Sequence, residues 1–336
     1  MTDLSGPSGG ARPATRTGAV PRTGPTGSAA RIGSNQYGKA ENRVVRIVRD
    51  GDTHHIKDLN VSVSLSGDLD DVHYSGSNTH VLPTDTTKNT VYAFAKEYGI
   101  ESAEQFGIHL ARHFVTSQEP IHRARIRIEE YAWERAGGGP GHSFVRKGQE
   151  TRVAQITFDG ARWEVVSGLK DLTVLNSTHS EFWGYAKDRY TTLKEAYDRI
   201  LATEVSARWR HSWTGGDGTG PEGTPPEGTP PDWDASYART REHILRAFAE
   251  TYSLSLQQTL YQMGARVIEH RPEIDEIRFS LPNKHHFLAD LTPFGLTNES
   301  ADGAVYLAAD RPYGLIEATV LREGAEQLIP DDLTTL

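Results

Sequence analysis

The sequence predicts an α+β fold in which helices cover one face of an antiparallel sheet. Several short segments alternate apolar and polar residues with period two, and longer ones place apolar residues at helical spacing. In the first half of the chain two strands are followed by two helices and then by more strands, and the second half repeats this order. A parallel, doubly wound sheet is disfavoured because its strands and helices would alternate along the chain.

The predicted strands are half-buried, since one side of each alternating segment is apolar and the other is polar. They include residues 60–65, 125–129, 155–158 and 278–281. An open antiparallel sheet leaves two unpaired edges, and assembly of several chains is one way to cover them. We therefore expect an oligomer.

Helices are predicted where apolar residues recur every three or four positions. The predicted helices are residues 85–98, 102–117, 191–202, 235–252 and 254–270. Two of them begin with the pattern of a capping box, at Ser102 with Gln105 and at Thr192 with Glu195.

The start of the first helix carries a dense polar cluster within the run V-L-P-T-D-T-T-K-N-T-V-Y, residues 81–92. Pro83 ends the preceding segment, and Thr84 or Asp85 can cap the first turn. The cluster lies at the positive end of a helix, where free N–H groups favour an anion. Taken by itself, the cluster is more simply interpreted as an N-cap.

Two stretches fall outside the predicted folded part. Residues 1–34 are rich in Gly, Pro, Ser, Thr, Ala and Arg, a mix that buries too little apolar surface to fold, so we expect a disordered tail. Residues 215–231 contain Glu-Gly-Thr-Pro-Pro twice in succession, and we expect a disordered Pro/Gly insert between a strand and a helix. The Gly-rich run at residues 137–141 lacks a phosphate-loop or dinucleotide spacing and is expected to be a hairpin turn.

Composition excludes several classes of protein. A net charge of −9 argues against nucleic acid as a partner, because binding to a phosphate backbone depends on clustered cations. No apolar stretch approaches the ~18 residues of a membrane span. Cysteine is absent, which excludes disulfides, thiolate metal sites and cysteine nucleophiles. No secretory signal is evident at the N-terminus and no peroxisomal Ser-Lys-Leu at the C-terminus, so we expect a cytoplasmic protein.

Fourteen histidines raise the question of a metal site. His109 and His113 lie one helical turn apart, but Leu110 replaces the Glu of a zincin motif and no third ligand is evident. The adjacent pairs at residues 54–55 and 285–286 would point to opposite faces of a strand. We therefore expect no metal and, without a cofactor fingerprint, no organic cofactor.

The run at residues 81–92 closely resembles the signature of the urate oxidases, or uricases. Further matches follow in the family's order between about residues 35 and 325. They are Tyr37-Gly38-Lys39, His142-Ser143-Phe144, residues 172–175 with Ser177-Thr178, Phe182-Trp183-Gly184, residues 190–195 with residues 198–201, Leu256-Gln257 and residues 280–285. The ordered combination is far more specific than any one match.

This resemblance implies two tandem T-fold domains of ββααββ order, at residues 35–165 and 166–330, whose sheets join across subunits into a tunnel-like barrel. It also implies a homotetramer with active sites at subunit interfaces, and neither metal nor organic cofactor. The implied reaction belongs to purine catabolism: urate, O2 and water give 5-hydroxyisourate and hydrogen peroxide, and the purine anion reduces O2 directly.

The resemblance also assigns catalytic roles. Lys39, Thr84 and His285 match the family's proton relay, in which a threonine hydroxyl passes the proton. A lysine can act as a base only if burial or a nearby charge lowers its pKa. Outside the Tyr-Gly-Lys context, Lys39 would be interpreted as a solvated surface charge.

The expected substrate site is drawn largely from the second half of the chain. Arg199 can offer two donors to the urate anion, although it could equally be a helix-surface cation. Gln257 matches the amide that pairs with the opposite purine edge, and Phe182 the ring on which the purine stacks. The O2 site is expected at Thr84 and Asn283. The remaining pocket residues are Asp85, Leu193, Leu256 and Ile316, with Asp85 and Leu256 acting through main-chain N–H groups.

Two alternatives remain open. A metal-dependent T-fold enzyme acting on a pterin or purine would need a zinc-binding set that we cannot assemble from this sequence. A non-enzymatic purine-binding protein would keep Arg199, Gln257 and Phe182, but would have no use for Lys39 and His285.

Overall fold

The structure is a computed structural model that describes residues 29–137, 141–148, 150–215, 228–299, 303–309 and 311–332. Most of the predicted N-terminal tail and most of the predicted Pro/Gly insert lie outside the described residues. None of the described helices is long and apolar enough to cross a lipid bilayer.

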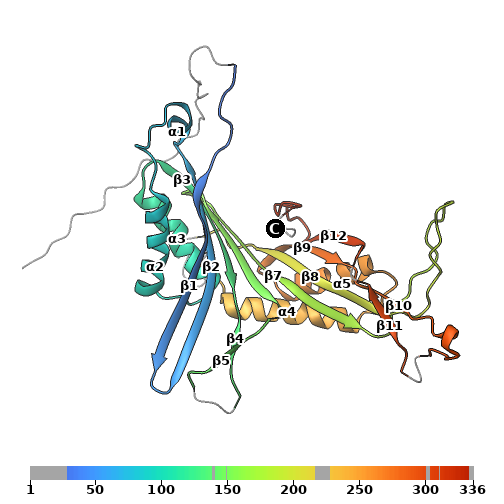
Figure 1. The fold of residues 1–336 in the computed structure, drawn as a ribbon. Coiled ribbons are helices and arrows are strands. Elements are labelled where there is room, and N and C mark those ends of the chain that lie inside the picture. The colour runs from blue at the N-terminus through green and yellow to red at the C-terminus, as the bar shows by residue number, and fades with distance from the viewer. Residues whose placement is uncertain are drawn as a thin grey trace, which may run out of the picture.

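Eight strands form one antiparallel sheet in the order β1-β2-β3-β6-β7-β8-β9-β12 (Figure 1). They are β1 (Tyr37–Asp50), β2 (Thr53–Gly67), β3 (Ile121–Glu130), β6 (Thr151–Phe158), β7 (Trp163–Asn176), β8 (Leu201–His211), β9 (Ile274–Pro282) and β12 (Leu315–Leu321). The four predicted strands fall within β2, β3, β6 and β9. Strands β1 and β12 are the two ends of this sheet.

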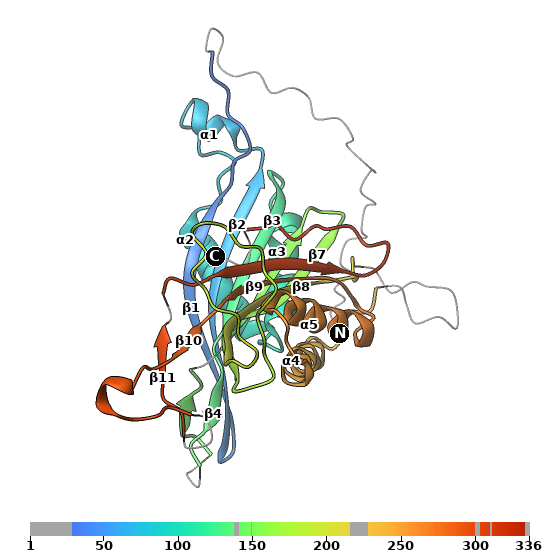
Figure 2. The ribbon, with the colours of Figure 1, turned by 90° about the vertical axis from the view of Figure 1, so that its right-hand side faces the viewer.

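Two pairs of helices pack on the sheet. They are α2 (Thr84–Glu97) with α3 (Ala103–Ser117), and α4 (Trp233–Glu250) with α5 (Leu256–His270); α1 (Asp70–Tyr74) is a short helix after β2. The first pair contacts β1, β3 and β6, and the second contacts β7, β9 and β12 (Figures 1 and 2). The order ββααββ therefore occurs twice, and the predicted α+β class is confirmed.

Each helix pair covers its own apolar core. In β2 the residues Leu59, Val61, Val63 and Leu65 are buried in the first core, which also includes α2 and α3. The second core combines residues of β7, β8 and β9 with α4 and α5. The intervening β2 positions, such as Ser62, face the other side of the sheet, because successive side chains of a strand alternate.

Two small hairpins complete the fold. Strands β4 (Trp133–Arg135) and β5 (Phe144–Arg146) pair with each other, as do β10 (His285–Leu288) and β11 (Tyr306–Ala309). The predicted Gly-rich turn falls between β4 and β5, although residues 138–140 themselves are outside the described part. A 3-10 turn, η1 (Thr292–Phe294), lies in the connection from β10 to β11.

The predicted helix at residues 191–202 is wrong. Residues 191–200 form an irregular segment, and β8 begins at Leu201. The main chains of Ala196 and Phe182 instead exchange two hydrogen bonds: the Ala196 N–H donates to the Phe182 carbonyl at 2.9 Å, and the Phe182 N–H donates to the Ala196 carbonyl at 2.7 Å. The Glu195 carboxylate accepts from Lys187 and Tyr197, so the capping box expected at Thr192 does not form. Tertiary pairing here overrides a local pattern.

The predicted caps have mixed outcomes. Ser102 accepts a hydrogen bond from the Gln105 main-chain N–H at 3.0 Å, as expected. At α2 the N-cap is Pro83, without a side-chain cap, so capping by Thr84 or Asp85 is wrong. The Asp85 carboxylate lies inside the first turn and binds its own helix, through Lys88 at 2.6 Å and an Asn89 amide.

Candidate functional site

Three predicted site residues of the first half gather where β1 meets the start of α2. Lys39 is a half-buried residue of β1, paired with Val63 of β2. Thr84 and Asp85 open α2. The pKa of the exposed Asp85 carboxyl is lowered, first by its hydrogen bond with Lys88 and in smaller part by the charge of Lys39. The Lys39 ammonium therefore lies within electrostatic reach of the α2 N-terminus.

The backbone around Lys39 is irregular and closely held. The pairing of β1 with β2 shifts register between Lys39 and Asn42, which is a β-bulge. The buried Asn42 amide donates to the Lys39 carbonyl at 3.1 Å and to the Val61 carbonyl at 2.8 Å. A Cβ on Gly38 would lie 1.9 Å from the Val63 oxygen, so only glycine fits beside Lys39.

A second set of predicted residues gathers in the other half, around Phe182. The Arg199 guanidinium carbon lies 5.1 Å from the centre of the Phe182 ring. Its Nε donates to Ser180 Oγ at 3.1 Å, and burial lowers the pKa of Arg199. Burial also lowers the pKa of His285, and the charge of Arg199 adds to that effect. Arg199 and His285 therefore lie near each other, and both burial and the charge of Arg199 favour the neutral form of the His285 imidazole.

The loop that carries Phe182 is braced by Tyr185. The two rings stack with centroids 5.0 Å apart and planes 16° from parallel. The Tyr185 hydroxyl donates to the Leu193 carbonyl at 2.6 Å. Leu193 itself is 55% exposed, so an apolar residue of the predicted pocket lies open to solvent in the single chain.

The start of α5 lies against the same loop. The main chain of Ser253 accepts from Glu181 at 2.8 Å and donates to His179 at 2.9 Å. Leu256 is buried and Gln257 exposed, and both lie in the first turn of α5. Ser255 Oγ accepts from the Gln258 N–H at 3.1 Å, whereas the N–H groups of Leu256 and Gln257 precede the first hydrogen bond within the helix. This arrangement places the Gln257 amide and these two N–H groups near the Phe182 loop.

The end of β9 brings the last predicted residues to this region. Asn283 forms an isolated bridge with Thr203 of β8, and its N–H donates to the Gly314 carbonyl at 2.8 Å. Ile316 of β12 pairs with Leu281 of β9 and packs against the second core. His285 then begins β10.

Comparison with known proteins identifies the family of this chain. A family model described as Uricase matches residues 35–157 and 165–317. The chain belongs to the uricase family. The predictions of this family and of the tandem T-fold are thereby confirmed.

Several uricases cover nearly the whole chain. The uricase of Arthrobacter globiformis is 48% identical over 89% of this chain and 93% of its own length. The uricase of Aspergillus flavus is 36% identical over 85% of this chain and 95% of its own length. The crystal structure of the Arthrobacter globiformis uricase matches with a TM-score of 0.81, covering 90% of this chain and 99% of that one. A urate oxidase from Bacillus sp. TB-90, at 23% identity and a TM-score of 0.70, shares the fold.

The two sets of residues are far apart in this uricase chain. Strand β1 and helix α2 lie on one side of the molecule in Figure 1, whereas β10 and α5 lie on the other. Within the described ranges, no hydrogen bond or ion pair joins Lys39, Thr84 or Asp85 to Arg199 or His285. A single uricase chain therefore holds two separate parts of the predicted site.

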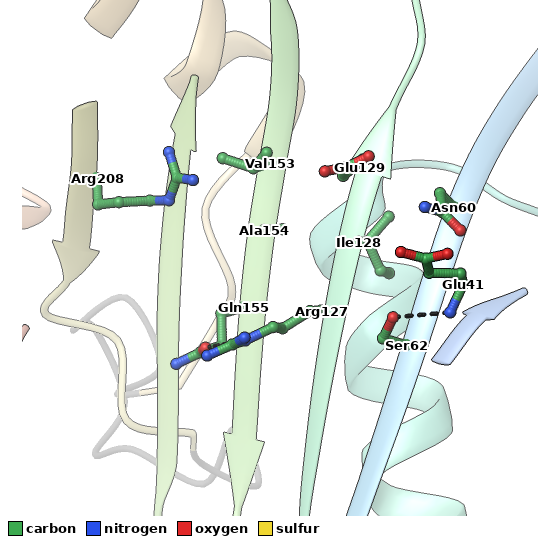
Figure 3. Close-up of a pocket in the computed structure, with 10 residues that line it drawn as sticks. All are labelled: Glu41, Asn60, Ser62, Arg127, Ile128, Glu129, Val153, Ala154, Gln155 and Arg208. Carbon is green, nitrogen blue, oxygen red and sulfur yellow. Dashed lines mark hydrogen bonds between the residues drawn. The ribbon is translucent and has the colours of Figure 1, made fainter. Parts of the chain in front are cut away.

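A cavity of 190 Å³ occupies the helix-free face of the sheet (Figure 3). Charged groups of both signs line it, among them Arg127, Arg208 and Glu129, and Arg127 donates to Gln155 at 2.9 Å. None of the predicted site residues contributes to its wall.

The histidines considered as metal ligands make other contacts. His109 forms a hydrogen bond with the Gln105 amide at 2.8 Å, and the His113 ring packs edge-on against Phe94 at 4.8 Å. Burial lowers the pKa of both rings. The parts of the chain that the structure describes contain no group of three or more His, Asp and Glu residues placed to hold a metal ion.

Several supporting residues were missed by sequence reasoning. Ser180, Tyr185 and Asn42 each hold a predicted site residue by a hydrogen bond or a stacked ring. In the sequence Tyr37 stands out only as the first residue of the Tyr-Gly-Lys match. No local periodicity marks such residues, because their partners lie 3 to 45 positions away.

Proposed function

We propose that this protein oxidises urate with O2 and water to 5-hydroxyisourate and hydrogen peroxide, a step of purine catabolism. The observation that carries the proposal is the placement of Arg199 over Phe182 and near His285, in a chain of the uricase family. A flat aromatic ring next to a planar cation suits a planar purine anion, because one offers a stacking surface and the other two parallel donors.

Binding of urate would use both edges of the purine. Arg199 would bind one edge, and the exposed Gln257 amide would supply a donor and an acceptor to the other. The first-turn N–H groups of Asp85 and Leu256 would add main-chain donors at positive helix ends. The side chains of Leu193 and Ile316 would close the pocket with apolar surface.

Proton transfer is assigned to Lys39, Thr84 and His285. In its neutral amine form Lys39 would accept a proton from bound urate, the Thr84 hydroxyl would pass it on, and the His285 imidazole could take it up. The resulting electron-rich anion gives two electrons to O2 at the position bounded by Thr84 and Asn283, and water supplies the oxygen that the product gains. One urate, one O2 and one water then yield one 5-hydroxyisourate and one peroxide.

A complete site would require a second subunit. Lys39, Thr84 and Asp85 are separated from Arg199 and His285 in one chain, so the two sets would meet across an interface of a homotetramer. The sheet ends and the β10–β11 hairpin carry exposed apolar residues that an interface would cover. They are Val45, Ile47, Val48, Phe287, Leu288, Leu307 and Leu315.

Two further parts of the proposal concern organisation. We place the boundary of the two T-fold domains at residues 165/166, near the start of β7. The two apolar cores support it, since they divide near this point except that Trp233 of α4 belongs to the first core. We also place the protein in the cytoplasm, which fractionation of cells that produce it would test.

The deciding experiment follows O2 uptake and peroxide formation after urate is added to metal-stripped protein. We expect consumption of O2 and release of peroxide in equal amounts, at the rate seen before metal removal. Urate binding without O2 uptake would instead indicate a purine-binding protein. Activity that returns only after zinc is added would indicate a metal-dependent enzyme.

A further inference from the structure

Tyr37 connects the two catalytic segments of the first half. Its hydroxyl accepts a hydrogen bond from the Leu82 main-chain N–H at 2.8 Å, across 45 positions of sequence. Its ring packs against the first apolar core together with Val81 and Leu82. The hydroxyl is therefore a fixed link between strand β1 and the segment that leads into α2.

The two ends of this link lie close to proposed catalytic residues. Tyr37 and Lys39 are alternate residues of β1, paired with Leu65 and Val63, so their side chains share one face of the strand. On the other side, only Pro83 separates Leu82 from Thr84, and the proline ring restricts the backbone there. Movement of Leu82 relative to Tyr37 would thus move Thr84 relative to Lys39.

We propose that Tyr37 is a positioning residue that sets the distance between Lys39 and Thr84 for proton transfer. The inference rests on the proposed function. Proton transfer needs donor and acceptor within about 3 Å, and a displacement of about 1 Å can lower a rate about 100-fold. Substrate contacts from Arg199 and Gln257 do not depend on this link, because both residues belong to the other half of the chain.

The test compares Tyr37→Phe with Tyr74→Phe. Tyr74 is a matched control, since its hydroxyl also accepts a hydrogen bond from a main-chain N–H, that of Ile32 at 2.7 Å, and neither residue belongs to the proposed site. We expect Tyr37→Phe to lower kcat about 10- to 100-fold with KM changed less than about twofold, and to shift the pH dependence of kcat. Tyr74→Phe should retain the wild-type kcat and pH profile.

Two further measurements separate positioning from loss of structure. In a Thr84→Ala background, Tyr37→Phe should lower kcat no further, because both changes interrupt the same transfer. A p-aminophenylalanine at position 37, which keeps an acceptor at similar reach, should restore most of the rate; p-methylphenylalanine, which fills the volume without an acceptor, should not. If Tyr37→Phe does not fold, the comparison of p-aminophenylalanine with p-methylphenylalanine at position 37 still tests the inference.

The outcomes distinguish this inference from the proposed function. A wild-type protein that does not turn over urate removes the proposed function and leaves nothing for Tyr37 to position. If the wild type is active and Tyr37→Phe keeps its kcat and pH profile, the Tyr37 inference alone is wrong. Equal losses of kcat and of melting temperature in Tyr37→Phe and Tyr74→Phe would also overturn the Tyr37 inference, since both tyrosines would then have a purely structural role.

Discussion

Acid should destabilise this protein through one buried histidine, His211. Its ring is 2% exposed at the end of β8, and Nε2 lies 3.0 Å from Ser167 Oγ, whose hydroxyl donates to Glu104 at 2.6 Å. Because the Ser167 hydroxyl donates its only proton to Glu104, the hydrogen bond between Ser167 and His211 must be donated by a proton on Nε2 of His211. Nδ1 is buried and has no hydrogen-bond partner among the described residues. A second proton on this ring would therefore be buried without an acceptor.

The size of the effect follows from the pKa of this group. Burial lowers the pKa of His211 to about 3, and the charges of Arg271 and Arg152 add to burial, whereas Glu273 opposes it. An unfolded histidine has a pKa of about 6.5. Between these values the unfolded chain binds one more proton, so the free energy of unfolding falls as pH falls through this window. The loss is about 1.4 kcal/mol per pH unit, or about 2.7 kcal/mol by about pH 4.5.

Urea unfolding of wild type and His211→Gln at about pH 7, 6 and 5, at one protein concentration, measures this contribution. The glutamine amide can still donate to Ser167 but does not titrate. We expect the difference in unfolding free energy between the two proteins to change by about 1.4 kcal/mol per unit below about pH 6.5. His55→Gln, at an exposed position, should keep the wild-type pH dependence. The same pH dependence in wild type and His211→Gln would refute the argument.

Three further changes have defined outcomes. Arg152→Met removes the guanidinium that forms an ion pair with the fully buried Glu104 at 2.6 Å, and it should lower the free energy of urea unfolding by about 3–5 kcal/mol. As a control, Arg246→Met removes an exposed ion pair and should change this free energy by less than about 1 kcal/mol. Ser102→Ala removes the α3 cap and should cost about 1 kcal/mol in the same assay; no loss would show that the cap contributes nothing. Phe182→Leu should raise KM for urate about 2- to 13-fold by loss of stacking, and an unchanged KM would remove Phe182 from the binding site.

Local pattern was sufficient for most of the fold. Four of the predicted helices correspond to α2, α3, α4 and α5, because each has a continuous apolar stripe that buries against the sheet. Residues 191–202 failed because Thr192 and Glu195 imitate a helix start while the main chain of Ala196 pairs with Phe182. Thr84 and Asp85 were expected to cap α2, but the helix begins one residue earlier, directly after Pro83.

The site was less accessible to local reasoning. Of the residues that the family resemblance selected, Lys39 lies near Asp85, and Arg199 lies near Phe182 and His285. Their supporting contacts depend on long-range register, such as the β-bulge after Lys39 and the link from Tyr37 to Leu82. No periodicity encodes these contacts, because they arise only when distant segments pair.

Each active site is proposed to take Lys39 and Thr84 from one subunit and Arg199 and His285 from another. Mixing Thr84→Ala and Arg199→Ala subunits, each of low residual activity, with exchange verified by mass spectrometry, tests this arrangement. In a random 1:1 mixture, one site in four would receive both intact residues, so urate-dependent O2 uptake should recover to about a quarter of the wild-type rate. No recovery despite complete exchange would contradict a shared site.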